Sequence, residues 1–189
     1  VLGESQTNDN EINAGTVTGT IVLQITGNTT ETASAVLNAS GNGSASYSSV
    51  TIYPTSSGLT ISGNFNLYLI DLNGADNVTI DGRVNATGTA KDLTIKNSNI
   101  GTSATTIRLY NSASSNIIKY CNIKGAVTST SKGIIFFYTS SSGSGNDNNL
   151  IDNNNITGDA AGRPNNGLYS TGTSGRENSG NIISNNNIY

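Results

Sequence analysis

An isoleucine pair spaced five positions apart recurs four times in this chain, each time with asparagine directly before the second isoleucine. Side chains on one straight strand alternate between its faces, so two inward-facing residues are separated by an even number of positions. An odd spacing with both isoleucines inside therefore requires a bend between them. Asparagine tolerates the left-handed backbone conformation that such a bend needs. The copies read IKNSNI at 95–100, IKYCNI at 118–123, IDNNNI at 151–156 and ISNNNI at 183–188.

A repeat of this length, made of strand, corner and strand, predicts a parallel β-helix, in which each turn of the chain (a rung) stacks on the one before. The rule for parallel crossovers makes the predicted helix right-handed. We expect the stacked isoleucines to form two buried columns and the asparagines to form a side-chain ladder. The first column is Ile80, Ile95, Ile118, Ile151 and Ile183, the second is Ile100, Ile123, Ile156 and Ile188, and the ladder is Asn99, Asn122, Asn155 and Asn187.

The rest of the sequence favours an all-β fold. Hydrophobic residues make up 34% of the chain and are concentrated in short β-branched runs, while the polar residues between them are typical of turns. No stretch combines helical periodicity with good helix formers. Predicted strands lie at 20–25, 50–53, 59–62, 68–72, 107–110, 134–137 and 168–171, and predicted polar loops at 140–148, 158–166 and 172–180.

The repeat divides the chain into two parts. Residues 1–66 fit it poorly, and we expect an irregular N-terminal cap with the first rungs, or alternatively a separate small domain. Residues 67–189 hold the regular rungs. The chain starts at Val1, contains no methionine and stops inside a repeat copy at Tyr189, so we expect a trimmed piece, truncated at its C-terminal end. Either further rungs or a neighbouring protein would cover that open rung, and end-to-end self-association is an alternative.

Charge and composition exclude several functions. The net charge is −3 without a basic cluster, which disfavours a nucleic-acid partner, and no apolar run is long enough to span a membrane. The chain has no histidine, which excludes imidazole catalysis and histidine-containing zinc sites. The lone Cys121 is interpreted as a structural turn residue. Asp147 and Asp152 leave weak calcium binding open, although their spacing matches no calcium loop, and no cofactor is expected otherwise.

Two groups of residues are candidates for ligand binding. The aromatic residues Phe137, Tyr138 and Tyr169 lie on or beside strands, where exposed rings would stack on sugars, or where the loop at 140–148 would cover them. Asp71 lies one rung from Arg108, which predicts either a surface ion pair or, less simply, part of a catalytic set. A mixed outward column is predicted from Asp81, Lys96, Lys119, Asp152 and Ser184.

Segments at 72–88, 133–140, 145–158 and 176–189 resemble the parallel β-helix regions, similar to pectate lyases in architecture, of large secreted or surface proteins of the Bacteroidota. This resemblance implies export by type IX secretion and an extracellular or cell-surface location. It carries no catalytic motif onto residues of this chain.

Together these observations predict a non-enzymatic structural or adhesive module that presents polar loops and binds glycans. Two alternatives stay open. One is a fragment of a polysaccharide lyase or glycoside hydrolase, and the other is a self-assembling extracellular fibre subunit.

Overall fold

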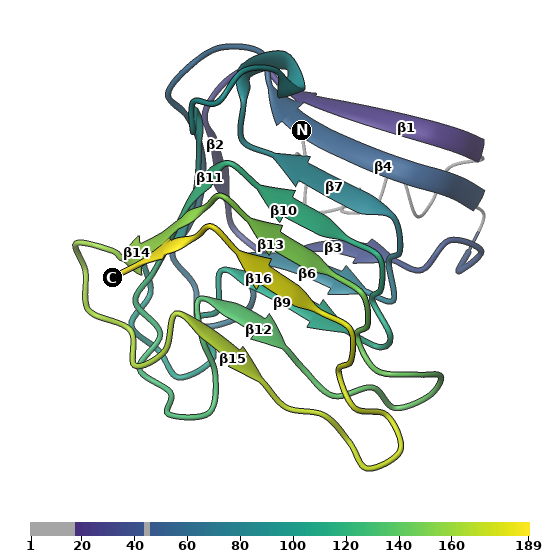
Figure 1. Ribbon diagram of the computed structural model, residues 1–189. Coiled ribbons are helices and arrows are strands. Elements are labelled where there is room, and N and C mark those ends of the chain that lie inside the picture. The colour runs from purple at the N-terminus through teal and green to yellow at the C-terminus, as the bar shows by residue number, and fades with distance from the viewer. Residues whose placement is uncertain (1–17, 44–45) are drawn as a thin grey trace.

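Figure 1 shows a computed structural model of the protein, described over residues 18–43 and 46–189. Over those residues the chain forms a parallel β-solenoid of about five turns, with one short 3-10 helix at Val84–Ala86. Each complete rung contributes one strand to sheet A, then one to sheet B, then one to sheet C, and the last rung contributes only to sheets A and B. The predicted all-β parallel β-helix is confirmed.

The three sheets run side by side along the solenoid (Figure 1). Sheet A is ordered β1 (Thr18–Ile25), β4 (Ser46–Pro54), β7 (Val78–Asp81), β10 (Ile117–Lys119), β13 (Leu150–Asp152) and β16 (Ile182–Ser184). Sheet B is ordered β2 (Thr29–Glu31), β5 (Leu59–Gly63), β8 (Leu93–Asn97), β11 (Cys121–Gly125), β14 (Asn155–Gly158) and β17 (Asn187–Ile188). Sheet C is ordered β3 (Ala35–Asn38), β6 (Ile70–Asn73), β9 (Ile107–Tyr110), β12 (Ile135–Phe137) and β15 (Leu168–Ser170).

The first strands belong to the same solenoid as the later ones. Strands β1, β2 and β3 pair in parallel with β4, β5 and β6, one in each sheet. The predicted cap includes residues 1–17, which lie outside the described residues, and the boundary at residue 66 stays a prediction.

Stacked isoleucines form the core, but the expected columns are wrong for one copy of the repeat, and Ile183 and Ile188 on the last rung are exposed. The column in sheet A joins Ile80, Ile118, Ile151 and Ile183, and Ile95 belongs instead to the column in sheet B, with Ile123. The rung that begins at Ile80 has a longer corner, so its second inward isoleucine comes only at Ile95. Ile100 follows β8 and is 58% exposed, so its predicted place in a buried column is wrong. The sheet B column is Ile61, Ile95, Ile123, Ile156 and Ile188.

The predicted bend between the paired isoleucines is present. Its left-handed residue lies two positions after the first isoleucine, at Tyr120, Asn153 and Asn185, with φ between 53° and 54°. A second left-handed position lies at the corner from sheet C to sheet A, at Asn77, Ser115, Asn148 and Gly180. Most of these residues are asparagine or glycine, for which this conformation costs least.

Directly after five of these seven left-handed residues, the chain turns an asparagine inward, while Cys121 follows Tyr120 and Val78 follows Asn77. At one corner Asn154 is fully buried, accepts a hydrogen bond from the Cys121 amide at 2.9 Å and donates to the Ile118 carbonyl at 2.8 Å. At the other corner Asn149 accepts from the Asn116 amide at 2.9 Å and donates to the Ala113 carbonyl at 3.0 Å. These amides supply hydrogen bonds to backbone groups of the neighbouring rung at both corners.

No helix in the described part of the chain is long and apolar enough to cross a membrane.

Candidate functional site

The outer face of sheet C carries the candidate site, built from one column of paired residues. Asp71 pairs with Arg108, Arg108 with Phe136, and Phe136 with Tyr169, each on the next strand of the sheet. The arginine donates from Nε to Asp71 Oδ1 at 2.9 Å and from Nη2 to Asp71 Oδ2 at 2.6 Å. The predicted ion pair between rungs is therefore present, in the two-bond geometry that arginine makes with carboxylates.

Tyrosine rings flank the Arg108 guanidinium. Its Cζ atom lies 3.6 Å from the ring centroid of Tyr68, 4.4 Å from that of Tyr110 and 5.8 Å from that of Tyr138. At these distances the guanidinium is attracted to the ring faces. The arginine side chain is 12% exposed and that of Asp71 is 7% exposed, so the pair is held rigidly beneath the tyrosines.

The aromatic row continues past Arg108. Tyr138 lies 5.5 Å from Tyr110 and 5.0 Å from Phe136, measured between ring centroids, and Phe136 lies 6.0 Å from Tyr169. The four tyrosines of this face are half-buried, with part of each side chain open to solvent. We call this set, made of Tyr68, Arg108, Tyr110, Phe136, Tyr138 and Tyr169, the aromatic face.

Phe137 does not reach the aromatic face. It is 2% exposed, belongs to the hydrophobic core and pairs with the inward-facing Leu109. Aligned on their first residues, the strands predicted at 107–110 and 134–137 would pair Ile107 with Ile134, whereas Ile135 pairs with Ile107. A shift of one residue moves every side chain of a strand to the other face. Phe136 therefore faces outward, and it is buried there among the neighbouring rings.

Sequence reasoning missed Tyr68 and Tyr110. Tyr110 stands two positions after Arg108 on the same strand, so alternation alone places both side chains on one face. That signal was available in the sequence. Tyr68 begins the strand predicted at 68–72, where alternation gives it the same inner face as Ile70 and Leu72, but it precedes β6, which begins at Ile70.

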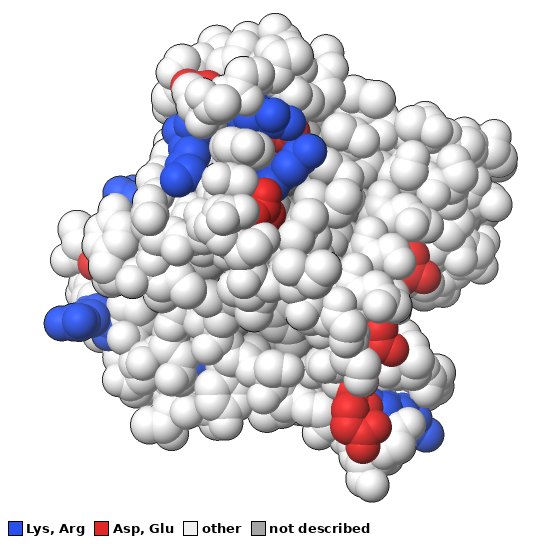
Figure 2. Space-filling model, in the orientation of Figure 1, with Lys and Arg blue, Asp and Glu red and all other residues white. Residues whose placement is uncertain are grey.

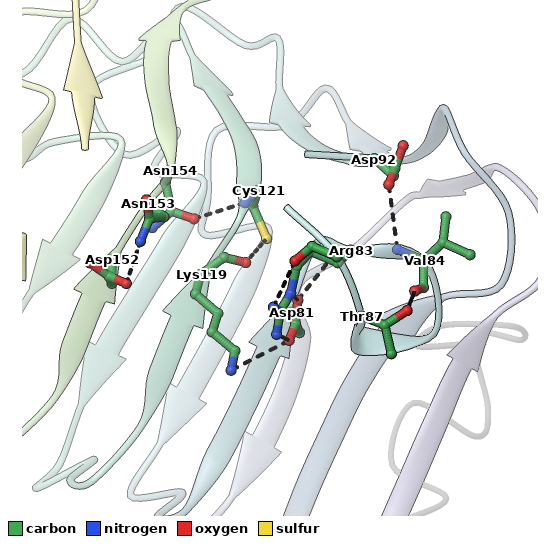
Figure 3. Close-up of polar contacts among 11 residues, drawn as sticks. Asp81, Arg83, Val84, Thr87, Asp92, Lys119, Cys121, Asp152, Asn153 and Asn154 are labelled. Atoms are coloured by element: carbon green, nitrogen blue, oxygen red, sulfur yellow. Dashed lines mark hydrogen bonds and ion pairs between the residues drawn. The ribbon is translucent and has the colours of Figure 1, made fainter. Parts of the chain in front are cut away.

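A second charged group lies on the outer face of sheet A (Figure 3). The Asp81 carboxylate accepts from Arg83 Nε at 2.9 Å and Nη2 at 2.6 Å, and Lys119 Nζ lies 3.5 Å away. Asp81 is 1% exposed. Burial acts to raise the pKa of Asp81, but the hydrogen bonds and charge of Arg83 outweigh it and hold the pKa below its ordinary value. Figure 2 shows that charges gather around this corner while most of the same face is uncharged.

The outward column predicted on sheet A is present without one member. Asp81, Lys119, Asp152 and Ser184 pair in sequence, as predicted. Lys96 lies instead on sheet B, opposite Lys124, because it belongs to the misaligned copy of the repeat. Asp152 accepts from Ser184 Oγ at 2.7 Å, and this bond is the main cause that lowers the pKa of Asp152.

Cys121 occupies the buried corner position that asparagine fills in the next rungs. It is fully buried, and desolvation strongly raises the pKa of its thiol. Its backbone amide donates to Asn154, in the same way that backbone amides at the other corners donate to inward asparagines. A structural role agrees with these contacts, since a thiol kept protonated is a poor nucleophile.

The outer asparagine ladder forms on sheet B with three of its four predicted members. Asn155 donates to Asn122 Oδ1 at 2.8 Å, and Asn187 donates to Asn155 Oδ1 at 2.9 Å. Asn99 is not in this ladder. It lies after β8 and donates to Asn64 at 3.2 Å, and Thr94 takes the ladder position in that rung.

The aspartates considered for calcium lie at different corners. Asp147 Oδ1 accepts from the Ser179 amide at 2.7 Å, while the Asp152 oxygens accept from side chains of its own corner and the next. Among the described residues, no group of three or more histidine, cysteine, aspartate or glutamate side chains is arranged to hold a metal ion.

Comparison with protein-family models, with curated proteins and with solved structures found no match to this chain. The fold and the side-chain geometry therefore carry the functional argument.

Proposed function

We propose that this chain is a non-enzymatic structural and adhesive module of an extracellular or cell-surface bacterial protein, and that its aromatic face binds glycans. The observation that carries the proposal is the Arg108 guanidinium, fixed by Asp71 and flanked by Tyr68 and Tyr110 within a row of half-exposed rings. Secretion and a bacterial origin in the Bacteroidota rest on the sequence resemblance and are part of this proposal.

The arrangement suits sugar recognition for two reasons. Tyrosine offers an apolar ring face to the C–H groups of a sugar and a hydroxyl to its polar edge. The rings are held by mutual packing and by Arg108, so binding orders few side chains and loses little conformational entropy.

The charged groups favour binding over catalysis. Both oxygens of Asp71 accept hydrogen bonds from Arg108, and both oxygens of Asp81 accept from Arg83. A general base must be free to take a proton from the substrate, and both oxygens of each of these carboxylates are occupied by hydrogen bonds from guanidinium groups.

The test is a glycan array followed by titration of each bound oligosaccharide. We expect Tyr138→Ala to weaken binding about tenfold, because loss of its stacking surface removes about 1.4 kcal/mol of binding free energy. Tyr53→Ala is the matched control, since Tyr53 is a partly buried tyrosine on the outer side of sheet A, and it should bind like the parent protein.

Two outcomes would contradict the proposal. One is release of shortened products from any bound polysaccharide, which would identify an enzyme. The other is equal binding by the Tyr138 and Tyr53 variants, which would place the glycan elsewhere.

A second candidate, end-to-end self-association, is favoured by apolar side chains on the last rung. Ile182, Ile183 and Ile188 are each more than half exposed. Strands β15, β16 and β17 stand at the edges of their sheets, where unpaired backbone groups can bind another strand.

A further inference from the structure

The outer face of sheet B places two lysines side by side, away from the aromatic face. Lys96 on β8 and Lys124 on β11 are paired in register, with Ser62 and Thr157 as the next residues of the same column. Both lysines are partly exposed. Adjacent strands are about 4.8 Å apart, so the two ammonium groups can reach the oxygens of a single carboxylate or sulfate group.

This pairing is unfavourable for the fold alone. Like charges directly opposite each other on neighbouring strands destabilise a sheet. Across residues 18–43 and 46–189, the ion pairs join Asp71 and Asp81 to other cations, and none includes Lys96 or Lys124. The carboxyl group that interacts electrostatically with Lys96 is Asp159, and its strongest favourable contact is a hydrogen bond from Ser98. One carboxylate near two ammonium groups leaves net positive charge on this face.

Neutral polar groups surround the lysine pair. The adjacent outward column holds the hydroxyl of Thr94 and the amides of Asn122 and Asn155. A third ammonium group, that of Lys91, donates to Asn155 Oδ1 at 2.9 Å, and Asn122 donates to the Lys91 carbonyl at 2.8 Å. The face therefore combines a local positive charge with donors and acceptors suited to sugar hydroxyls.

We propose that the outer face of sheet B binds an anionic polysaccharide, with one carboxylate or sulfate group seated between Lys96 and Lys124. Hydroxyls of the sugar would bond to Asn122 and Thr157 beside it. The net charge of the chain is −3, so the attraction for an anionic polymer is confined to this face. The site is separate from the aromatic face and does not depend on glycan binding there.

The experiment titrates the purified protein with dextran sulfate, polygalacturonate and uncharged dextran at low and moderate salt. We expect one or both charged polymers to bind, with an affinity that falls as salt rises, and uncharged dextran to bind much more weakly. The stronger of the two charged polymers identifies sulfate or carboxylate as the preferred group. Lys124→Gln should weaken binding about fivefold, and the Lys96→Gln, Lys124→Gln double variant more.

The matched control is Lys132→Gln, which removes the same charge from the connection between β11 and β12, where Lys132 Nζ donates to Ser103 Oγ at 2.8 Å. It should bind like the parent protein. Thermal unfolding checks that Lys124→Gln still folds, and we expect its midpoint to be unchanged or higher because a like-charge pair is removed.

Three results would overturn the proposal: equal losses in the Lys124 and Lys132 variants, equal binding of charged and uncharged dextran, or tighter binding of duplex DNA than of either charged polymer. The Tyr138→Ala variant should bind the charged polymers normally. Failure at sheet B and failure at the aromatic face are thus separate results.

Discussion

Asparagine has three different roles in this chain, and its position at the corner determines which one. At a left-handed corner position such as Asn153 it relieves backbone strain. One residue later, Asn154 turns inward and bonds to the backbone of the neighbouring rung. One residue later again, Asn155 faces outward and bonds to side chains. In the run at 153–155, the first asparagine therefore forms the corner, the second bonds to backbone groups inside the solenoid, and the third belongs to the ladder on the surface.

We expect the inner asparagine to contribute most to stability among the three, because its bonds are buried. Replacing Asn154 with leucine leaves the buried Cys121 amide without its partner and removes one hydrogen bond to the Ile118 carbonyl. A buried unsatisfied group costs about 1–3 kcal/mol, so we expect the free energy of unfolding to fall by about 2 kcal/mol. Chemical denaturation measures this loss.

The outer neighbour provides the control. Asn155→Leu removes bonds among partly exposed side chains only, and we expect a loss below about 1 kcal/mol. Losses of equal size at the two positions would show that the inner bonds have no special weight.

Strand positions were more predictable than strand partners. The strand predicted at 107–110 is β9 with the same bounds, and Asp71 opposite Arg108 was predicted correctly. Both follow from short-range alternation of side chains. The partner of Ile118 in the previous rung was not predictable from spacing, because the chain between β7 and β8 makes a longer corner that includes the short helix. Such an insertion changes the spacing of the isoleucines and leaves their stacking intact.

Between neighbouring rungs the backbone approaches so closely that some corners accept only glycine. A Cβ atom added at Gly82 would lie 2.1 Å from the Tyr120 carbonyl oxygen, which belongs to the backbone of the next rung. We expect Gly82→Ala to push β7 and β10 apart and to lower the free energy of unfolding by about 2 kcal/mol or more.

Gly27→Ala is the matched change, because a Cβ atom there meets nothing within 4 Å and the residue has no positive φ. Its stability should equal that of the parent protein or slightly exceed it. A Gly82 variant as stable as the Gly27 variant would show that the corner can relax at no cost.

At the scale of the whole molecule, the solenoid presents faces of different chemistry. Sheet C is aromatic outside, sheet B carries lysines among hydroxyls and amides, and sheet A holds the ion pairs of Asp81. The sequence predicted the column of charges on sheet A and the aromatic residues of sheet C only in part. Which residue faces outward depends on the register of the strand. A register error of one residue on β12 predicts that Phe137 faces outward, whereas Phe136 does.

Self-association belongs to this scale, because it depends on the last rung as a whole. If copies stack end to end, the average mass in solution should rise with concentration, and Ile183→Lys should abolish the rise by placing a charge on the exposed end of the sheet A column. Light scattering over a concentration series measures this. Ile117→Lys, on the outer side of β10, is the control and should associate like the parent protein. A constant mass of one chain at every concentration would exclude this second candidate.

The bonds between rungs also bear on how such a chain folds. Most side-chain bonds that bridge neighbouring rungs join residues that are between 28 positions apart, as for Thr128 and Ile100, and 41 positions apart, as for Asn116 and Ala75. Closing a loop of this size has nearly the same entropic cost at every rung. Folding can then proceed by adding one rung at a time to any rung already formed. A longer solenoid of this kind needs more such steps, but no step requires a wider search of the chain.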